Sequence, residues 1–134
     1  MPLSKSRIEE GTDLNLQFEK RGGILPVVVQ ESATGDILML ASVNTEALEH
    51  SIKTRRAAFW STSRNELWEK GLTSGNTLKL DEVLVDCDQD ALIYKVTLEG
   101  TGVCHTKNRS GSHRKACFYR KLNPDTQKLE FIHE

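Results

Sequence analysis

Long apolar runs, paired cysteines and an excess of one charge are all absent from this sequence of 134 residues. No apolar stretch approaches the roughly 20 residues of a membrane-spanning helix. The polar N-terminus also lacks the apolar core of a signal peptide. The net charge of −1 gives no reason to expect nucleic acid or an anionic membrane as a partner. We therefore expect a cytoplasmic protein with neither of these partners.

Cysteine is scarce, with only Cys87, Cys104 and Cys117 in the chain. Three thiols cannot all pair with one another, and a reducing compartment disfavours disulfides. The paired C-x-x-C spacing of a zinc ribbon is missing. A cysteine in an apolar strand is usually a core residue. Three thiolates can also hold zinc and leave its fourth position open to water, as in a catalytic site. The spacing alone leaves both interpretations open.

The length fits one compact domain over residues 1–134. Apolar and β-branched runs predict strands at 24–29, 37–41, 57–60, 78–86 and 91–98, and short strands at 118–122 and 129–132. The turn at 32–36 joins the first two strands in a hairpin. Asn44 should cap the one main helix, whose inner stripe would be Ala47, Leu48, Ser51 and Ile52.

Two segments lie outside this pattern. Residues 1–17 form an N-terminal extension with a short helix around 4–10, and residues 107–116 form an extended basic loop. The predicted fold class is α+β, a strand-rich domain with a curved mixed or antiparallel sheet.

Three acids, Asp86, Asp88 and Asp90, follow an apolar strand. Fully extended, the first and last would stand about 13 Å apart at about 3.3 Å per residue, too far for one ion. The chain must therefore curl if the three share a cation; otherwise they are a solvated acidic loop. A calcium EF-hand loop is excluded because Ala91 and Thr97 stand where it needs Gly and Glu. Magnesium suits these ligands best.

Residues 61–76 are predicted to form a polar loop, interrupted by Leu67, Trp68 and Leu72. Its hydroxyls, glycines and cations can hold phosphate, although the spacing is not that of a P-loop. A plain surface loop is the alternative. His105 adjoins Cys104 and is a candidate general acid or base. The candidate substrate and phosphate residues are Trp60, Ser61, Arg64, Lys70, Thr73, Ser74 and Gly75.

Taken together, these stretches resemble the phosphoribosyl-AMP cyclohydrolases. The resemblance covers about residues 23–122 and rests on several ordered motifs. These motifs are Leu-Pro-Val-Val-Val-Gln at 25–30, Asn-Thr-Glu-Ala-Leu at 44–48, Phe-Trp-Ser-Thr-Ser-Arg at 59–64, Leu-Trp-Glu-Lys-Gly-Leu-Thr-Ser-Gly-Asn at 67–76, Asp-Cys-Asp-Gln-Asp-Ala-Leu at 86–92, Cys-His-Thr at 104–106 and Cys-Phe-Tyr-Arg at 117–120.

The resemblance implies a monofunctional enzyme of the third step of histidine biosynthesis. Such an enzyme opens the adenine ring of N1-(5-phosphoribosyl)-AMP by hydrolysis at the N1–C6 bond. It further implies magnesium on Asp86, Asp88 and Asp90, zinc on Cys87, Cys104 and Cys117, and an intertwined homodimer in which Cys87 comes from the other subunit.

Two departures from the family pattern stand out. Twelve residues separate Cys104 from Cys117, where the family has a shorter segment of the form CHTGxxSC. This longer loop offers His113 as a substitute zinc ligand, although Phe-Tyr-Arg after Cys117 favours the cysteine. Ser42 and Val43 replace a pair that is commonly aromatic plus Met.

Two other classes compete with a cyclohydrolase. A zinc deaminase would show H-x-E and P-C-x-x-C, and neither is present. A zinc-stabilised binding module would saturate the ion with four protein ligands, whereas this chain offers three cysteines.

Overall fold

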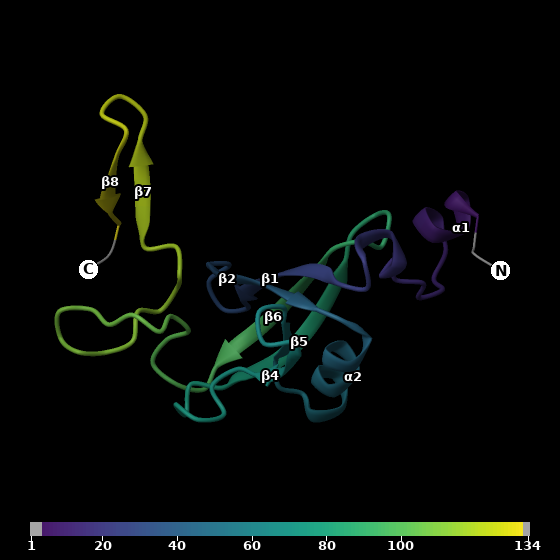
Figure 1. Ribbon diagram of the computed structural model, residues 1–134, viewed down its shortest axis with the longest axis horizontal. Coiled ribbons are helices and arrows are strands. Elements are labelled where there is room, and N and C mark those ends of the chain that lie inside the picture. Colours follow the sequence, from purple (N-terminus) through teal and green to yellow (C-terminus); the bar gives the residue numbers. More distant parts are fainter. Residues whose placement is uncertain (1–3, 133–134) are drawn as a thin grey trace.

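The computed structural model describes residues 4–132, and a four-stranded mixed sheet forms their centre (Figure 1). Its order is β2-β1-β6-β5, built from β1 (Leu25–Glu31), β2 (Ile37–Val43), β5 (Leu78–Val85) and β6 (Leu92–Leu98). β1 runs antiparallel to β2 and parallel to β6, and β6 runs antiparallel to β5. The prediction of a strand-rich α+β domain with a mixed sheet is confirmed.

The β1–β2 hairpin forms at the predicted turn. Gly35 adopts a φ of 81°, which a glycine reaches without steric cost, and its N–H donates to the Glu31 carbonyl at 2.9 Å. Pro26 pairs with Ser42 of β2, while pairing with β6 begins only at Val27. The proline, which has no N–H to donate, therefore lies where the ladder to β6 has not yet begun.

The main helix α2 (Thr45–Thr54) begins as predicted. The Asn44 side chain accepts a hydrogen bond from the Ala47 N–H at 2.9 Å. Ala47, Leu48 and Ser51 are buried, as expected. The prediction for Ile52 was wrong, because its side chain is 42% exposed. Ile52 lines a hollow between α2 and residues of the N-terminal segment.

The prediction of one loop over 61–76 was also wrong in part. β3 (Ala58–Ser61) pairs antiparallel with β4 (Glu66–Glu69), which lies inside that range. Trp68 is opposite Phe59, and their ring centroids are 5.5 Å apart. The packing of these two rings stabilises β4, which was predicted as loop because the residues around it are polar. α2 contacts both strands of this hairpin.

The remaining elements lie toward the two ends of the molecule (Figure 1). α1 (Lys5–Glu10) and the 3-10 turn η1 (Glu19–Arg21) precede β1. β7 (Arg120–Asn123) and β8 (Lys128–Phe131) form a hairpin that stands apart from the central sheet (Figure 1). Both predicted C-terminal strands exist, with bounds shifted by one or two residues from the predicted 118–122 and 129–132. Within residues 4–132, no helix combines the length and apolarity needed to span a membrane.

Candidate metal centres

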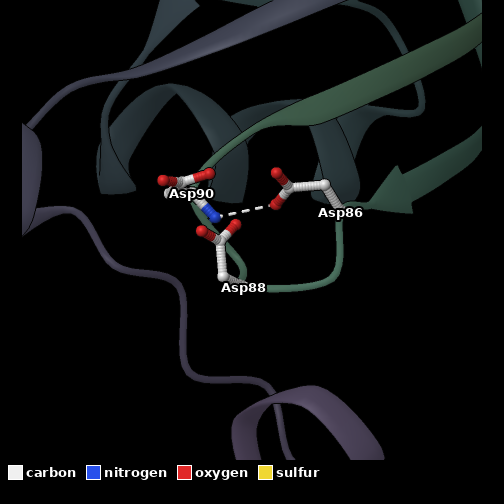
Figure 2. A group of neighbouring side chains, drawn as sticks. All are labelled: Asp86, Asp88 and Asp90. Atoms are coloured by element: carbon white, nitrogen blue, oxygen red, sulfur yellow. Dashed lines mark hydrogen bonds between the residues drawn. The ribbon is translucent and has the colours of Figure 1, made fainter. Parts of the chain in front are cut away.

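The three acids converge because the chain turns back directly after β5. One carboxylate oxygen from each of Asp86, Asp88 and Asp90 lies within 4.8 Å of the others. Figure 2 shows the turn, in which Asp86 Oδ1 accepts the Asp90 N–H at 2.9 Å. The same oxygen accepts the Ala91 N–H at 3.1 Å. Gln89 takes a left-handed conformation, with φ 58°, at the tip. The curl that a shared cation requires is therefore present, and three hard oxygen donors suit magnesium.

Two cations from the N-terminal side lie against these acids. The Lys20 ammonium is 3.0 Å from Asp90 Oδ2 and 3.4 Å from Asp88 Oδ2. The Arg21 guanidinium also donates to Asp90 Oδ2 at 3.0 Å. The hydrogen bond from Lys20 is the main cause that holds the pKa of the Asp90 carboxyl well below its usual range. A divalent ion held by Asp88 and Asp90 would thus compete with Lys20 for their oxygens.

The Gln89 side chain, which is 6% exposed, joins the N-terminal extension to the acid loop by hydrogen bonds. Its amide nitrogen donates to the carbonyls of Ile8 and Asp13, both at 3.1 Å, and its amide oxygen accepts the Asn15 N–H at 2.7 Å. These bonds explain why residues 8–15 lie beside the acids although more than seventy residues of sequence separate them.

Cys104 and Cys117 form the second centre. Cys104 is buried, and its sulfur lies 2.8 Å from the Thr106 hydroxyl and 3.5 Å from the Thr106 N–H. Burial acts to raise the pKa of the Cys104 thiol, but the bonds from Thr106, the Cys117 thiol and the charge of Arg114 outweigh it. The pKa therefore lies below its ordinary value. A thiol with this environment is ready to bind a metal as the thiolate.

Cys117 completes this pair. Burial raises the pKa of its thiol, and the negative charge of Cys104 raises it further. The negative charge of one thiolate disfavours ionisation of its neighbour. A cation bound between the two sulfurs would stabilise both negative charges, which is the chemistry of a zinc site. The positive charge of Lys70 also acts on both cysteines, although burial lowers the pKa of the Lys70 ammonium.

Cys87 lies elsewhere, exposed within the acid loop. Across residues 4–132, the acids are the only group of three or more potential ligands whose atoms converge within 4.8 Å. A single chain therefore brings two of the three predicted zinc ligands together but not the third.

The two histidines near Cys104 differ in their surroundings. His105 is exposed beside it. His113 is half-buried, and its Nδ1 lies 2.8 Å from the Cys104 carbonyl oxygen. His113 does not form a ligand group with both sulfurs in this part of the chain.

The predicted substrate residues fall into two places. Trp60, Ser61 and Arg64 line a cavity of about 360 Å³ between β2 and the β3–β4 hairpin, together with Trp68. Thr73, Ser74 and Gly75 lie on an exposed turn, closed by the Gly75 N–H donating to the Gly71 carbonyl at 2.8 Å. Lys70 lies between the two groups in the sequence, and its ammonium is 5.3 Å from the centre of the Trp68 ring.

Several residues at these centres were missed in the sequence. Lys20 and Arg21 carry no local signal, because they meet the acids only through the fold. Thr106 could have been found, since a hydroxyl two residues after a ligand cysteine can reach back to its sulfur.

Comparison with known proteins places the chain among its relatives. The family model for phosphoribosyl-AMP cyclohydrolase matches residues 39–119. A phosphoribosyl-AMP cyclohydrolase of Desulfatibacillum aliphaticivorans is 50% identical over 112 residues, which are 84% of this chain and 85% of that protein. One from Hyphomonas neptunium is 46% identical over 121 residues, covering 90% and 86% of the two chains.

A longer relative matches a similar share of the chain. The histidine biosynthesis bifunctional protein HisIE of Thermus thermophilus is 45% identical over 117 residues, which are 87% of this chain and 51% of that protein. The chain belongs to the phosphoribosyl-AMP cyclohydrolase family, enzymes of histidine biosynthesis.

Proposed function

We propose that this enzyme opens the adenine ring of N1-(5-phosphoribosyl)-AMP at N1–C6, using zinc and magnesium, as a homodimer that shares each zinc between subunits. The observation that carries the proposal is the division of the cysteines. Cys104 and Cys117 interact within one chain, whereas Cys87 lies in the acid loop. A third thiolate then has to come from Cys87 of the partner subunit.

Exposed apolar side chains flank both parts of this divided site. Leu84 and Val85, which precede Cys87, are 41% and 40% exposed, and they lie on β5, an edge strand of the sheet. Phe118, which follows Cys117, is 54% exposed. The β7–β8 hairpin beyond it exposes Leu122, Leu129 and Phe131.

These apolar surfaces support an interface with a second copy. A two-stranded hairpin is marginally stable on its own in water, and clustered apolar surface marks interaction sites. In a twofold dimer, the surface near Cys87 of one subunit would meet the surface near Cys117 of the other, and the contact would be repeated by symmetry. Both surfaces then become buried, and two complete zinc sites form.

The chemistry requires water to attack a ring carbon at neutral pH. The oxygen adds to C6, the N1–C6 bond breaks, and N1 takes up a proton. Zinc, when bound by the three thiolates, would lower the pKa of a water molecule toward about 7. His105, exposed beside Cys104, is placed to accept the proton of that water or to deliver one to N1.

The chain's other residues would bind the two ends of the substrate. The cavity beside Trp60 offers aromatic surface for a base, with Ser61 and Arg64 at its lining for a phosphate. Magnesium on Asp86, Asp88 and Asp90 would attract a second phosphate. Lys20 would have to release these carboxylates, and it could then contact the same phosphate.

The test is an assay on purified protein supplied with both metals. We expect an absorbance change on conversion of phosphoribosyl-AMP, with no ammonia released because the exocyclic nitrogen stays in the product. The activity should fall on chelation and return with zinc and magnesium. Release of ammonia would indicate a deaminase, and zinc binding without turnover would indicate a binding module.

Cys104→Ala tests the zinc ligands directly. It should remove zinc and activity together, because two remaining thiolates hold the ion poorly. Ser110→Ala, on the exposed tip of the loop at 107–116, is the matched control and should retain both. Full zinc in an active Cys104→Ala enzyme would exclude Cys104 as a ligand.

A further inference from the structure

The long segment between Cys104 and Cys117 folds back onto the residues around Cys104. The Cys104 N–H donates to the Arg114 carbonyl at 3.1 Å, and the Val103 N–H donates to the Lys115 carbonyl at 3.1 Å. The Arg114 N–H donates in turn to the Thr106 carbonyl at 3.0 Å. An isolated bridge between Lys107 and His113 extends this pairing. The extra residues thus form a short, paired hairpin rather than a free loop.

Gly102 shows how tightly the two segments approach. A Cβ atom at this position would stand 2.3 Å from the Arg114 carbonyl oxygen and 2.7 Å from that of His113. Both contacts are with backbone atoms, so a larger residue would force the segments apart. The hairpin therefore depends on a glycine two residues before Cys104.

The His113 ring adds a bond on the other side of the same peptide. Its Nδ1 lies 2.8 Å from the Cys104 carbonyl oxygen. A carbonyl only accepts, so the proton is on Nδ1. The hairpin consequently holds both backbone polar groups of Cys104, the N–H through Arg114 and the C=O through His113.

These contacts orient the sulfur. With the Cys104 backbone held on both sides, the side chain starts from a fixed position, and Thr106 then contacts the sulfur itself. We propose that His113 is a positioning residue and not itself a zinc ligand. By holding the backbone carbonyl of Cys104, it orients the Cys104 sulfur toward the zinc. The inference rests on the proposed zinc site and gives the longer loop a role in it.

The first experiment needs no metal. The ring nitrogens of His113 can be assigned by NMR in the zinc-free, full-length protein. The geometry predicts the tautomer with the proton on Nδ1. Finding the proton on Nε2 alone would overturn the inference, whether or not zinc binds. The result is therefore separate from the fate of the proposed function.

The second experiment measures zinc affinity by competition with a chromophoric chelator in three variants. His113→Leu removes the donor, His113→Asn keeps an N–H that can reach the carbonyl, and Ser110→Ala is the control in the same loop. Loss of a group that orients a metal ligand costs about 10–100-fold in affinity. We expect a weakening of this size for Leu, substantial recovery for Asn and no change for the control.

Cobalt substitution separates positioning from ligation. If His113 acts only through Cys104, the cobalt spectrum of His113→Leu at saturation should match that of the unchanged protein, because no ligand is lost. A changed spectrum would make His113 a ligand, and unchanged zinc affinity would deny it any role; either result overturns the proposal. Circular dichroism will show whether each variant is folded. If His113→Leu does not fold, the zinc affinity of His113→Asn and the tautomer found by NMR still test the proposal. Absence of zinc from the unchanged protein would refute the proposed function and this inference together.

Discussion

Asp86 has two separable roles, and two substitutions should distinguish them. Its Oδ1 accepts the N–H groups of Asp90 and Ala91 at 2.9 and 3.1 Å, which closes the acid loop. Its charge is also part of the proposed magnesium site. An asparagine side chain keeps an oxygen for both N–H groups but loses the charge, whereas alanine loses both.

The expected magnitudes follow from these contacts. A hydrogen bond contributes about 0.5–1.5 kcal/mol to folding, so Asp86→Ala should lose about 1–3 kcal/mol. The lower half of this range is expected because Asp86 is exposed and water can replace part of the loss. The free energy of unfolding of Asp86→Asn should lie within about 0.5 kcal/mol of that of the unchanged protein. Both should bind magnesium more weakly.

Urea unfolding in the presence of a chelator measures the first role, and calorimetric titration with magnesium measures the second. Asp88→Ala is the matched control, because Asp88 contacts Lys20 at 3.4 Å but accepts neither of the two N–H groups, those of Asp90 and Ala91, that close the loop through Asp86. It should weaken magnesium binding and leave the urea midpoint nearly unchanged. Equal stability of Asp86→Ala and the unchanged protein, or full magnesium affinity in Asp86→Asn, would refute the reasoning.

Three further predictions concern the core, the chemistry and pH. Ser51→Ala should cost about 2–3 kcal/mol in urea unfolding, because it orphans the buried Ala58 N–H, which donates to Ser51 at 2.9 Å, and the Tyr94 hydroxyl; a loss below about 0.5 kcal/mol would contradict this. His105→Ala should keep zinc but lower turnover by about 10²–10⁴-fold, and near-normal turnover would remove it from the mechanism. Hydrogen bonds hold the pKa of several carboxyls below its usual value, so these carboxylates stabilise the folded protein above about pH 4 and this contribution is lost as the pH falls. Melting temperatures that stay constant between pH 6 and about 3 would contradict this. These carboxyls, with their first bonding partners, are Glu31 with Lys115, Asp90 with Lys20 and Glu99 with Thr77.

The parts of the fold that local chemistry determines could be predicted from the sequence. Asn44 capped α2 and Gly35 closed the first hairpin, because each needs only its near neighbours. β4 was missed because its stability comes from Trp68 packing on Phe59 of the facing strand. Lys20 and Arg21 were missed at the acid loop for a similar reason, since only the fold brings them to Asp90.

The candidate site divides in the same way. In an extended strand the first and last acids would lie about 13 Å apart, yet the turn at Gln89 gathers them. No local pattern shows that Cys104 and Cys117 interact while Cys87 lies apart, because that depends on the path of the whole chain. The zinc ligands and the dimer remain predictions.

The central claim is that each zinc site is assembled across two subunits, and a mixed dimer tests it most directly. Cys87→Ala and Cys104→Ala homodimers should both be inactive, because every site lacks one ligand. In a mixed dimer, one site combines both defects while the other has all three cysteines. Co-refolding the two variants should therefore restore about half the activity per heterodimer, with zinc in proportion, as twofold symmetry requires. No recovery in heterodimers shown to have formed would mean that the three cysteines do not meet across the interface.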